Sequence, residues 1–391
     1  MSTTTNGSAP EDAQEALLDL IDEQETEGPL LEVKDLKTYF QLEAGNVRAV
    51  DGVSFTLDRG KTLGVVGESG SGKTVLSRSI MGIIIARNVL REGSVTYDGR
   101  ELIGESPNKL RRLWGREMAM VFQDPMTSLN PVVKIGRQLT EGLTQNLGMS
   151  KKEAKELAIA GLRSVGIPSA ERRFDDYPHQ LSGGMRQRVG IAIALACGPK
   201  LLFADEPTTA LDVTVQAQIL DLLQEQQRER FMAMILVTHD LGVVANRADE
   251  ICVMYAGQIV EKAPALSLFS AVRMPYTEAL LNSIPKLTDP SHTRLQAIGG
   301  RPPDLISPPT GCRFSPRCPY VQDKCRQEMP PLVEDTPGHQ YRCWFPVDVS
   351  VAVPEPADRP AVDFEAGTGR LDQAAPKQKL FEPRPTARRE D

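Results

Sequence analysis

The feature that most constrains this chain is a glycine-rich octapeptide, GESGSGKT, at residues 67–74. It follows an apolar run at 63–66, which predicts a buried parallel strand, and precedes residues 75–80, whose spacing predicts a helix. A strand, a glycine-rich turn and a helix are together the context that a phosphate-binding P-loop requires. The loop consists of Gly67, Glu68, Ser69, Gly70, Ser71, Gly72, Lys73 and Thr74.

The residue types of this loop suit a bound triphosphate. Side chains at the glycine positions would crowd backbone N–H groups that point at phosphate oxygens. The N-terminus of the following helix adds a favourable field for negative charge. Lys73 can reach the β- and γ-phosphates, and Thr74 offers a hydroxyl group to Mg²⁺. We therefore predict that the chain binds a nucleoside triphosphate together with Mg²⁺.

Composition limits the class of protein that carries this loop. With 391 residues, 40% of them hydrophobic and 25% charged, the chain is typical of a soluble protein with two or three domains. It has neither an apolar run of roughly 18 residues nor a signal-peptide pattern, so we expect a cytoplasmic chain. Eight acidic residues in 1–29, where Lys and Arg are absent, account for the net charge of −7. The remainder is nearly neutral, and we expect no nucleic-acid partner.

The pattern of apolar residues predicts an α/β fold in four parts. Residues 1–29 are expected to form an acidic, disordered leader, and residues 30–265 the nucleotide-binding domain. Within that domain we expect antiparallel strands before the P-loop, beginning with an edge strand at 31–36, and a helical insertion at about 124–183. Prolines accumulate after residue 265. We expect a small cysteine-containing domain at 266–346 and a disordered tail at 347–391.

Polar side chains follow two of the predicted buried strands. Asp205 ends one strand, where an open α/β sheet presents its ligands, and is placed to hold Mg²⁺. Glu206 comes next and is the candidate general base. Gln123 ends the strand at 118–122, can contact Mg²⁺ and the attacking water, and leads into the helical insertion. We predict that Glu206 faces the γ-phosphate and that Gln123 is a sensor linking the nucleotide state to the helical insertion.

A set of motifs in a fixed order carries a family resemblance. The P-loop is followed by LSGGMRQR at 181–188, DEP at 205–207, ALD at 210–212 and His239. Over about residues 30–265 the chain resembles an ABC-type ATPase subunit. The resemblance implies a P-loop (RecA-like) core with an antiparallel β subdomain and the helical insertion. It further implies that His239 holds the γ-phosphate and positions Glu206, which makes Glu206, His239 and Gln123 the catalytic group.

The same resemblance implies two further contacts with ATP. Phe40 matches the aromatic residue that stacks on adenine. Ser182 can N-cap the helix after it, leaving N–H groups free for an anion. In the family this end, here Ser182, Gly183 and Gly184, closes on ATP bound to the P-loop of a partner, which makes a head-to-tail sandwich.

Three further segments indicate the subtype of ABC ATPase. Residues 122–131 (FQDPMTSLNP), 275–281 (PYTEALL) and 311–314 (GCRF) are similar to dipeptide and oligopeptide importer ATPases, although Met274 stands where that family usually has His. This implies a peripheral subunit at the cytoplasmic side of the cell membrane. Its implied partners are a second homologous ATPase, two multi-span permease subunits and an extracytoplasmic peptide-binding protein. Nickel importers share much of the pattern and are the alternative.

The alternative to a transporter subunit is a soluble ABC ATPase that acts on DNA or ribosomes. Chromosome-maintenance members insert long coiled coils between P-loop and signature, whereas only about 110 residues intervene here. Ribosome-associated members carry two cassettes in one chain, and this chain has one. The sequence therefore favours the transporter subunit.

Four of the six cysteines lie close together in a proline-rich segment, with the spacing C-x5-C-x6-C-x17-C: Cys312, Cys318, Cys325 and Cys343. A cytosolic chain seldom forms disulfides, so four thiolates predict a zinc ion or an iron–sulfur cluster. Spacing alone does not decide between them, and a loop of free thiols is the third possibility. Peptide importers that keep these cysteines carry a [4Fe-4S] cluster, so the resemblance implies a cluster. Cys197 and Cys252 are expected to be small core residues.

Overall fold

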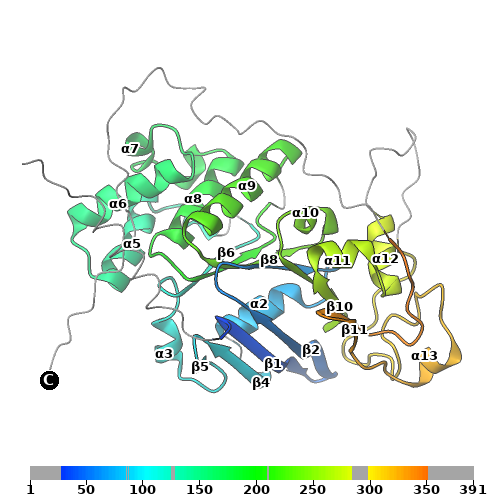
Figure 1. Cartoon of the computed structure of the whole chain (residues 1–391). Coiled ribbons are helices and arrows are strands. Elements are labelled where there is room, and N and C mark those ends of the chain that lie inside the picture. Colours follow the sequence, from blue (N-terminus) through cyan, green and yellow to red (C-terminus); the bar gives the residue numbers. More distant parts are fainter. Residues whose placement is uncertain are drawn as a thin grey trace, which may run out of the picture.

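The computed structural model describes residues 28–84, 86, 88–124, 128–208, 211–283 and 298–350. Within these residues the centre of the molecule is a sheet of eight strands in the order β11-β12-β10-β9-β3-β8-β7-β6 (Figure 1). The strands are β3 (Thr62–Val66), β6 (Met118–Val121), β7 (Leu201–Asp205), β8 (Ala233–Thr238), β9 (Glu250–Tyr255), β10 (Gln258–Pro264), β11 (Val333–Thr336) and β12 (His339–Tyr341). Pairing is parallel from β6 to β9 and antiparallel from β9 to β11. The P-loop follows β3, near the middle of the sheet.

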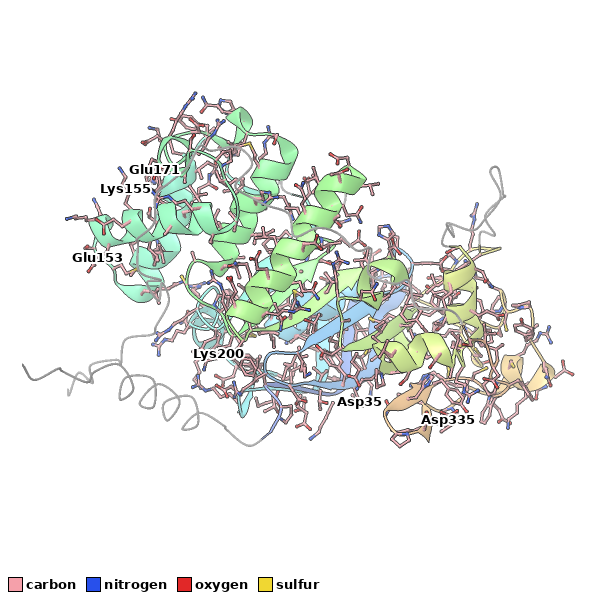
Figure 2. All side chains as sticks on the ribbon, turned by 45° about the horizontal axis from the view of Figure 1, so that its top comes forward. Asp35, Glu153, Lys155, Glu171, Lys200 and Asp335 are labelled. Carbon is pink, nitrogen blue, oxygen red and sulfur yellow. The ribbon has the colours of Figure 1, made fainter. Side chains whose placement is uncertain are left out.

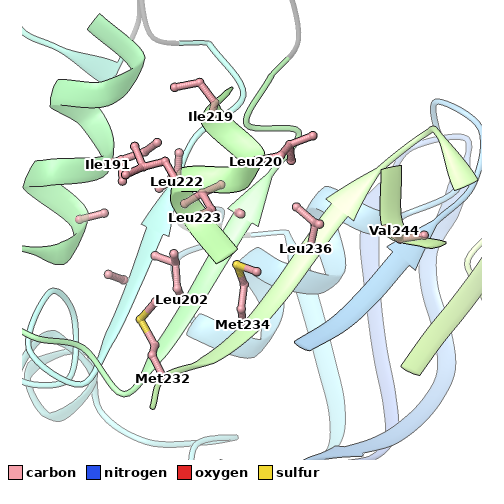
Figure 3. Close-up of a cluster of buried hydrophobic side chains, with 14 of the residues drawn as sticks. Ile191, Leu202, Ile219, Leu220, Leu222, Leu223, Met232, Met234, Leu236 and Val244 are labelled. Atoms are coloured by element: carbon pink, nitrogen blue, oxygen red, sulfur yellow. The ribbon is translucent and has the colours of Figure 1, made fainter. Parts of the chain in front are cut away.

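The parallel strands are buried on both faces, as their continuous apolar sequences predict. Leu202 of β7 packs in one hydrophobic cluster, and its neighbour Phe203 packs in a second cluster across the sheet. The first cluster includes side chains of α8 (Gly183–Leu195) and α9 (Val213–Glu229). Figure 3 shows Leu202 and Met234 of the sheet beside Leu222 and Leu223 of α9. Two cores therefore fix the strand ends that carry the polar residues.

A second, antiparallel sheet has the order β2-β1-β4-β5. Its strands are β1 (Leu31–Leu42), β2 (Gly45–Leu57), β4 (Val89–Tyr97) and β5 (Arg100–Glu101), and it packs against α2 (Lys73–Met81) (Figure 1). The expected edge strand at 31–36 was wrong, because β4 pairs with the side of β1 that β2 leaves open. Alternating polarity reports one exposed face of a sheet, and it says nothing about which strands are at the edge.

The region between β6 and β7 is helical. It contains α5 (Ile135–Leu147), α6 (Lys151–Ser164), α7 (Ala170–Arg173) and the 3₁₀ turn η1 (Pro178–Gln180). The side chain of Ser150 accepts a hydrogen bond from the Glu153 N–H group, and the Glu153 carboxylate accepts one from the Ser150 N–H group, as the sequence predicts. Figure 2 shows Glu153, Lys155 and Glu171 at the end of this region away from the sheets.

The C-terminal segment extends the main sheet. Its helices are α11 (Ala265–Ser270), α12 (Pro275–Asn282) and α13 (Asp323–Gln327). Two other short helices lie earlier in the chain: α3 (Pro107–Arg111) before β6, and α10 (Leu241–Ala245) between β8 and β9. Because β12 pairs with β10, a separate fold for 266–346 is not evident and stays an expectation. The expected tail begins too early, since Val349 pairs with Val272. The expected leader and the rest of the tail lie outside the described residues.

Across the described ranges, every helix is too short or too polar to traverse a lipid bilayer.

Candidate nucleotide-binding site

The P-loop connects β3 to α2 in the geometry that its glycines require. Gly72 has a φ of 103°, and a Cβ atom there would lie 2.1 Å from the backbone oxygen of Ala49. Lys73 begins α2, and its Nζ donates hydrogen bonds to the backbone oxygens of Gly67 (2.7 Å) and Glu68 (3.0 Å). Burial lowers the pKa of Lys73, while the carboxylates of Glu206, Asp205 and Glu68 oppose that shift. A buried lysine at a helix N-terminus suits a polyanion.

Thr74 and Asp205 form the part of the site that fits a divalent cation. The hydroxyl group of Thr74 donates to Oδ1 of Asp205 over 2.9 Å. Oδ2 of Asp205 is buried and has no hydrogen-bond partner among the described residues. Burial raises the pKa of this carboxyl group, since a buried charge is unfavourable without a counter-ion. An unsatisfied carboxylate oxygen beside a hydroxyl group is a donor set suited to Mg²⁺.

Three side chains meet at one carboxylate oxygen next to this pair. Nε2 of Gln123 donates to Oε2 of Glu206 over 3.0 Å, and Nδ1 of His239 lies 3.6 Å from the same oxygen. These residues follow β6, β7 and β8, which are neighbours in the sheet, so their carboxyl ends bring the side chains together. Glu206 has a φ of 45°, a left-handed conformation that is unusual outside glycine. The constellation predicted from sequence is thus assembled.

An open cavity of about 950 Å³ connects these groups. Its lining includes Phe40, Lys73, Thr74, Gln123, Glu206 and His239. Sequence reasoning missed the opposite wall, which Leu280, Ser283, Ile298, Pro302 and Leu305 supply. Leu280 belongs to the 275–281 motif, which gave no indication of a role at the nucleotide cavity. Ile298, Pro302 and Leu305 lie in a stretch without a recognisable motif, so no local signal marks them. The volume is within the range of small-molecule sites, about 300–1,000 Å³.

The signature residues lie elsewhere. Ser182 is the N-cap of α8, and its hydroxyl group accepts a hydrogen bond from the N–H group of Met185 (3.3 Å). Neither Ser182, Gly183 nor Gly184 is among the described residues that line the cavity. A Cβ atom at Gly184 would lie 2.8 Å from Val215, whereas one at Gly183 would meet only Leu211 at 3.7 Å. Packing inside the chain therefore explains a glycine at 184 but not at 183.

The four C-terminal cysteines share one small cavity. Cys312, Cys318, Cys325 and Cys343 all line a space of about 10 Å³ together with Phe314. Their sulfur atoms are not joined in disulfides. Burial raises the pKa of Cys318 to about 11 and that of Cys343 to about 12.

The arrangement of these thiols does not bear out the expected metal centre. Among the described residues no group of three or more Cys, His, Asp or Glu side chains is placed to hold a metal ion. Cys252 is a buried core residue and Cys197 is half-buried against the first core, as expected.

Fold and site together define an ATP-binding cassette, an ATPase. The ABC transporter family profile matches residues 50–209, and the profile "oligopeptide/dipeptide transporter, C-terminal region" matches residues 260–325. Similar proteins include the oligopeptide transport ATP-binding protein OppD of Bacillus subtilis, 48% identical over 81% of this chain and 88% of that protein. The dipeptide transport ATP-binding protein DppD of Escherichia coli is 48% identical over 82% of this chain and 97% of its own length. The chain belongs to this family of peptide-transport ATP-binding proteins.

Solved structures agree on the cassette. A dimeric, post-hydrolysis form of the ATP-binding cassette MJ0796 bound to ADP and Pi has a TM-score of 0.55 and 26% identity, covering 60% of this chain and 98% of that one. The cbiO1 protein of Clostridium perfringens, part of the ABC transporter complex cbiONQ, has a TM-score of 0.53 and 28% identity, covering 62% and 91%. The predicted ABC ATPase fold is confirmed.

Proposed function

We propose that this chain hydrolyses ATP to power the import of dipeptides or oligopeptides across the cytoplasmic membrane. The observation that carries the proposal is that residues of both matched regions, 50–209 and 260–325, line one cavity. The wall formed by Leu280, Ile298, Pro302 and Leu305 lies within the matched peptide-transporter region, and it lines the same cavity as the P-loop. The region specific to peptide transporters is thereby part of the nucleotide site.

The site residues suggest how hydrolysis proceeds. The P-loop and Lys73 hold the phosphates, and Phe40 stacks on adenine. Thr74, Asp205 and Gln123 would hold Mg²⁺, and the ion would supply positive charge to offset that of the phosphates. Glu206 orients the attacking water and accepts its proton as the oxygen bonds to the γ-phosphorus, while ADP leaves. His239 keeps the Glu206 carboxylate in place and contacts the phosphoryl oxygens.

A second ATPase subunit completes the site in this proposal. Ser182, Gly183 and Gly184 are remote from the cavity of their own chain, and Ser182 leaves N–H groups at the start of α8 open to an anion. We infer that they dock on ATP bound by a homologous partner chain, giving a head-to-tail heterodimer. The similar MJ0796 cassette was solved as a dimer.

The remaining partners follow from the helical region. Gln123 contacts Glu206, and the chain then enters α5 through Val132, which is 78% exposed. We infer that nucleotide state is passed through this connection to two multi-span permease subunits, which an extracytoplasmic binding protein supplies with peptide. The chain would then lie at the cytoplasmic side of the membrane.

A [4Fe-4S] cluster on Cys312, Cys318, Cys325 and Cys343 is the second part of the proposal. Four thiols around one space, with no competing His or carboxylate in its lining, are a donor set for iron–sulfur chemistry. A single zinc ion held by the same four thiolates is the alternative, and the metal content of the purified protein distinguishes the two. The cluster would supply a covalent staple for a segment with little core of its own.

Reconstitution tests the transport function. The chain, the proposed ATPase partner and the permeases are placed in liposomes with the peptide-binding protein, and phosphate release is measured with peptides or with Ni²⁺. Stimulation by peptides and their accumulation on the far side are expected. Stimulation by Ni²⁺ alone would support the nickel alternative, and activity independent of the permeases would overturn the transporter assignment.

A further inference from the structure

A buried arginine reaches from the cysteine segment to the P-loop. Arg317, which directly precedes Cys318, has a side chain that is only 2% exposed. Its Nη1 donates to Oε2 of Glu68 (2.6 Å) and its Nη2 donates to Oε1 of the same carboxylate (2.9 Å). This two-point contact is the geometry in which Arg–carboxylate pairs are strongest and most directional.

The rest of the guanidinium group is also used. Nε donates to the backbone oxygen of Gly299 (2.8 Å), Nη2 to that of Ile298 (3.2 Å), and Nη1 to the hydroxyl group of Tyr255 (3.3 Å). All five N–H donors of Arg317 therefore have acceptors. A lysine could not reproduce this planar set.

Glu68 is held at its backbone as well. Its N–H group donates to the hydroxyl group of Tyr276 (2.9 Å), a fully buried residue of α12. The Glu68 backbone oxygen accepts a hydrogen bond from Nζ of Lys73 (3.0 Å), the lysine that faces the phosphates. Displacing Glu68 would therefore move an acceptor of Lys73 and the start of the phosphate loop.

The backbone groups that Arg317 contacts at 298–299 belong to the wall of the nucleotide cavity. Ile298 lines the nucleotide cavity, as do Pro302 and Leu305 further along. The backbone oxygen of Leu305 accepts a hydrogen bond from the N–H group of Arg48 in β2 (3.1 Å), so this wall is fixed to the sheet that carries Phe40. One guanidinium group thus ties the phosphate loop to the wall that faces it.

We propose that Arg317 is a positioning residue of the ATP site, which sets the distance between the P-loop and the 298–305 wall before ATP binds. The inference rests on the ATP site proposed above. It makes nucleotide affinity dependent on the C-terminal segment. The catalytic group of Gln123, Glu206 and His239 stands on other strands, so the effect belongs to binding rather than to the chemical step.

The test compares variants of the full chain in its transporter complex. Arg317→Ala is expected to raise the KM and the Kd for ATP about 10- to 100-fold, the range that loss of a charge-assisted hydrogen bond corresponds to. The kcat value should change less than about threefold. Arg317→Lys should retain most of the defect. Glu68→Gln should cause a similar increase, and the double variant Glu68→Gln/Arg317→Ala should be little worse than either single variant.

Two other arginines of the segment serve as controls. Arg342 is partly buried and donates to the backbone oxygens of Ile259 and Pro330, neither of which is a P-loop residue. Arg326 makes an exposed ion pair with Asp323. Arg342→Ala should lower thermal stability without the increase in Kd, and Arg326→Ala should change neither quantity.

The outcomes separate the two proposals. Failure of the wild-type complex to bind ATP would overturn the proposed function itself. If the wild type binds ATP while Arg317→Ala has an unchanged Kd, or a Kd raised no more than that of Arg342→Ala, Arg317 is only a structural residue. If Arg317→Ala does not fold, Glu68→Gln decides, because an unchanged Kd in that variant contradicts the inference.

Discussion

Replacing Gly183 by Asp is expected to abolish ATP hydrolysis without destabilising the chain. A Cβ atom at Gly183 would meet only Leu211 Cδ2 at 3.7 Å, which is an ordinary contact. The residue begins α8, and an acidic side chain in the first turn of a helix contributes about 0.3–1 kcal/mol of stability. The free energy of unfolding of the variant should therefore be unchanged or slightly higher.

The loss of activity would arise only in the assembled sandwich. There the new carboxylate would face the γ-phosphate of ATP bound by the partner subunit. Two like charges about 4 Å apart repel by about 4 kcal/mol at an effective dielectric constant of about 20. That energy corresponds to a decrease of about 10³-fold in the closed assembly. ATP should still bind the variant's own P-loop, because no signature residue is among the described lining of that cavity.

The assay uses the purified transporter. Photolabelling with azido-ATP reports nucleotide bound to each ATPase chain, and phosphate release reports hydrolysis. Gly183→Asn adds the same bulk without charge and should lose less activity. Gly184→Ala should instead lower the melting temperature, since its Cβ atom would lie 2.8 Å from Val215 Cγ1 of α9. Loss of labelling on the variant chain itself, or hydrolysis at the wild-type rate, would refute docking in trans.

Three further substitutions test the other parts of the site. Glu206→Gln should lower kcat about 10²–10⁴-fold, the weight of a general base, and should accumulate ATP-bound protein; turnover within twofold of wild type would exclude the proposed role of Glu206. Lys73→Ala should weaken equilibrium binding of ATP, and unchanged binding would contradict the P-loop assignment. Anaerobically purified wild-type protein should contain about four irons per chain. Cys318→Ser should abolish this iron content, whereas the control Cys197→Ser should keep it. One zinc and no iron in the wild type would overturn the cluster.

Local sequence patterns were enough to predict the catalytic face. Glycines that no side chain could replace mark the P-loop, and apolar runs that end on Asp205 and Gln123 mark adjacent strand ends. Parallel strands deliver such ends to one edge of a sheet, so Gln123 and Glu206 could be placed together although 83 residues separate them. Ser150 and Glu153 gave the start of α6 for a similar reason, because a capping box acts over three residues.

Contacts whose partners share no local pattern were not predictable. The place of β1 inside its sheet depends on β4, and alternation within β1 carries no information on that pairing. Arg317 and Glu68 are 249 residues apart, and neither residue is unusual in its own segment. An arginine before a cysteine reads as an ordinary surface charge until folding buries it, after which its five donors require acceptors. The acceptors available are a P-loop carboxylate and the backbone of the cavity wall. Burial, rather than any motif, is what connects the cysteine segment to the nucleotide site.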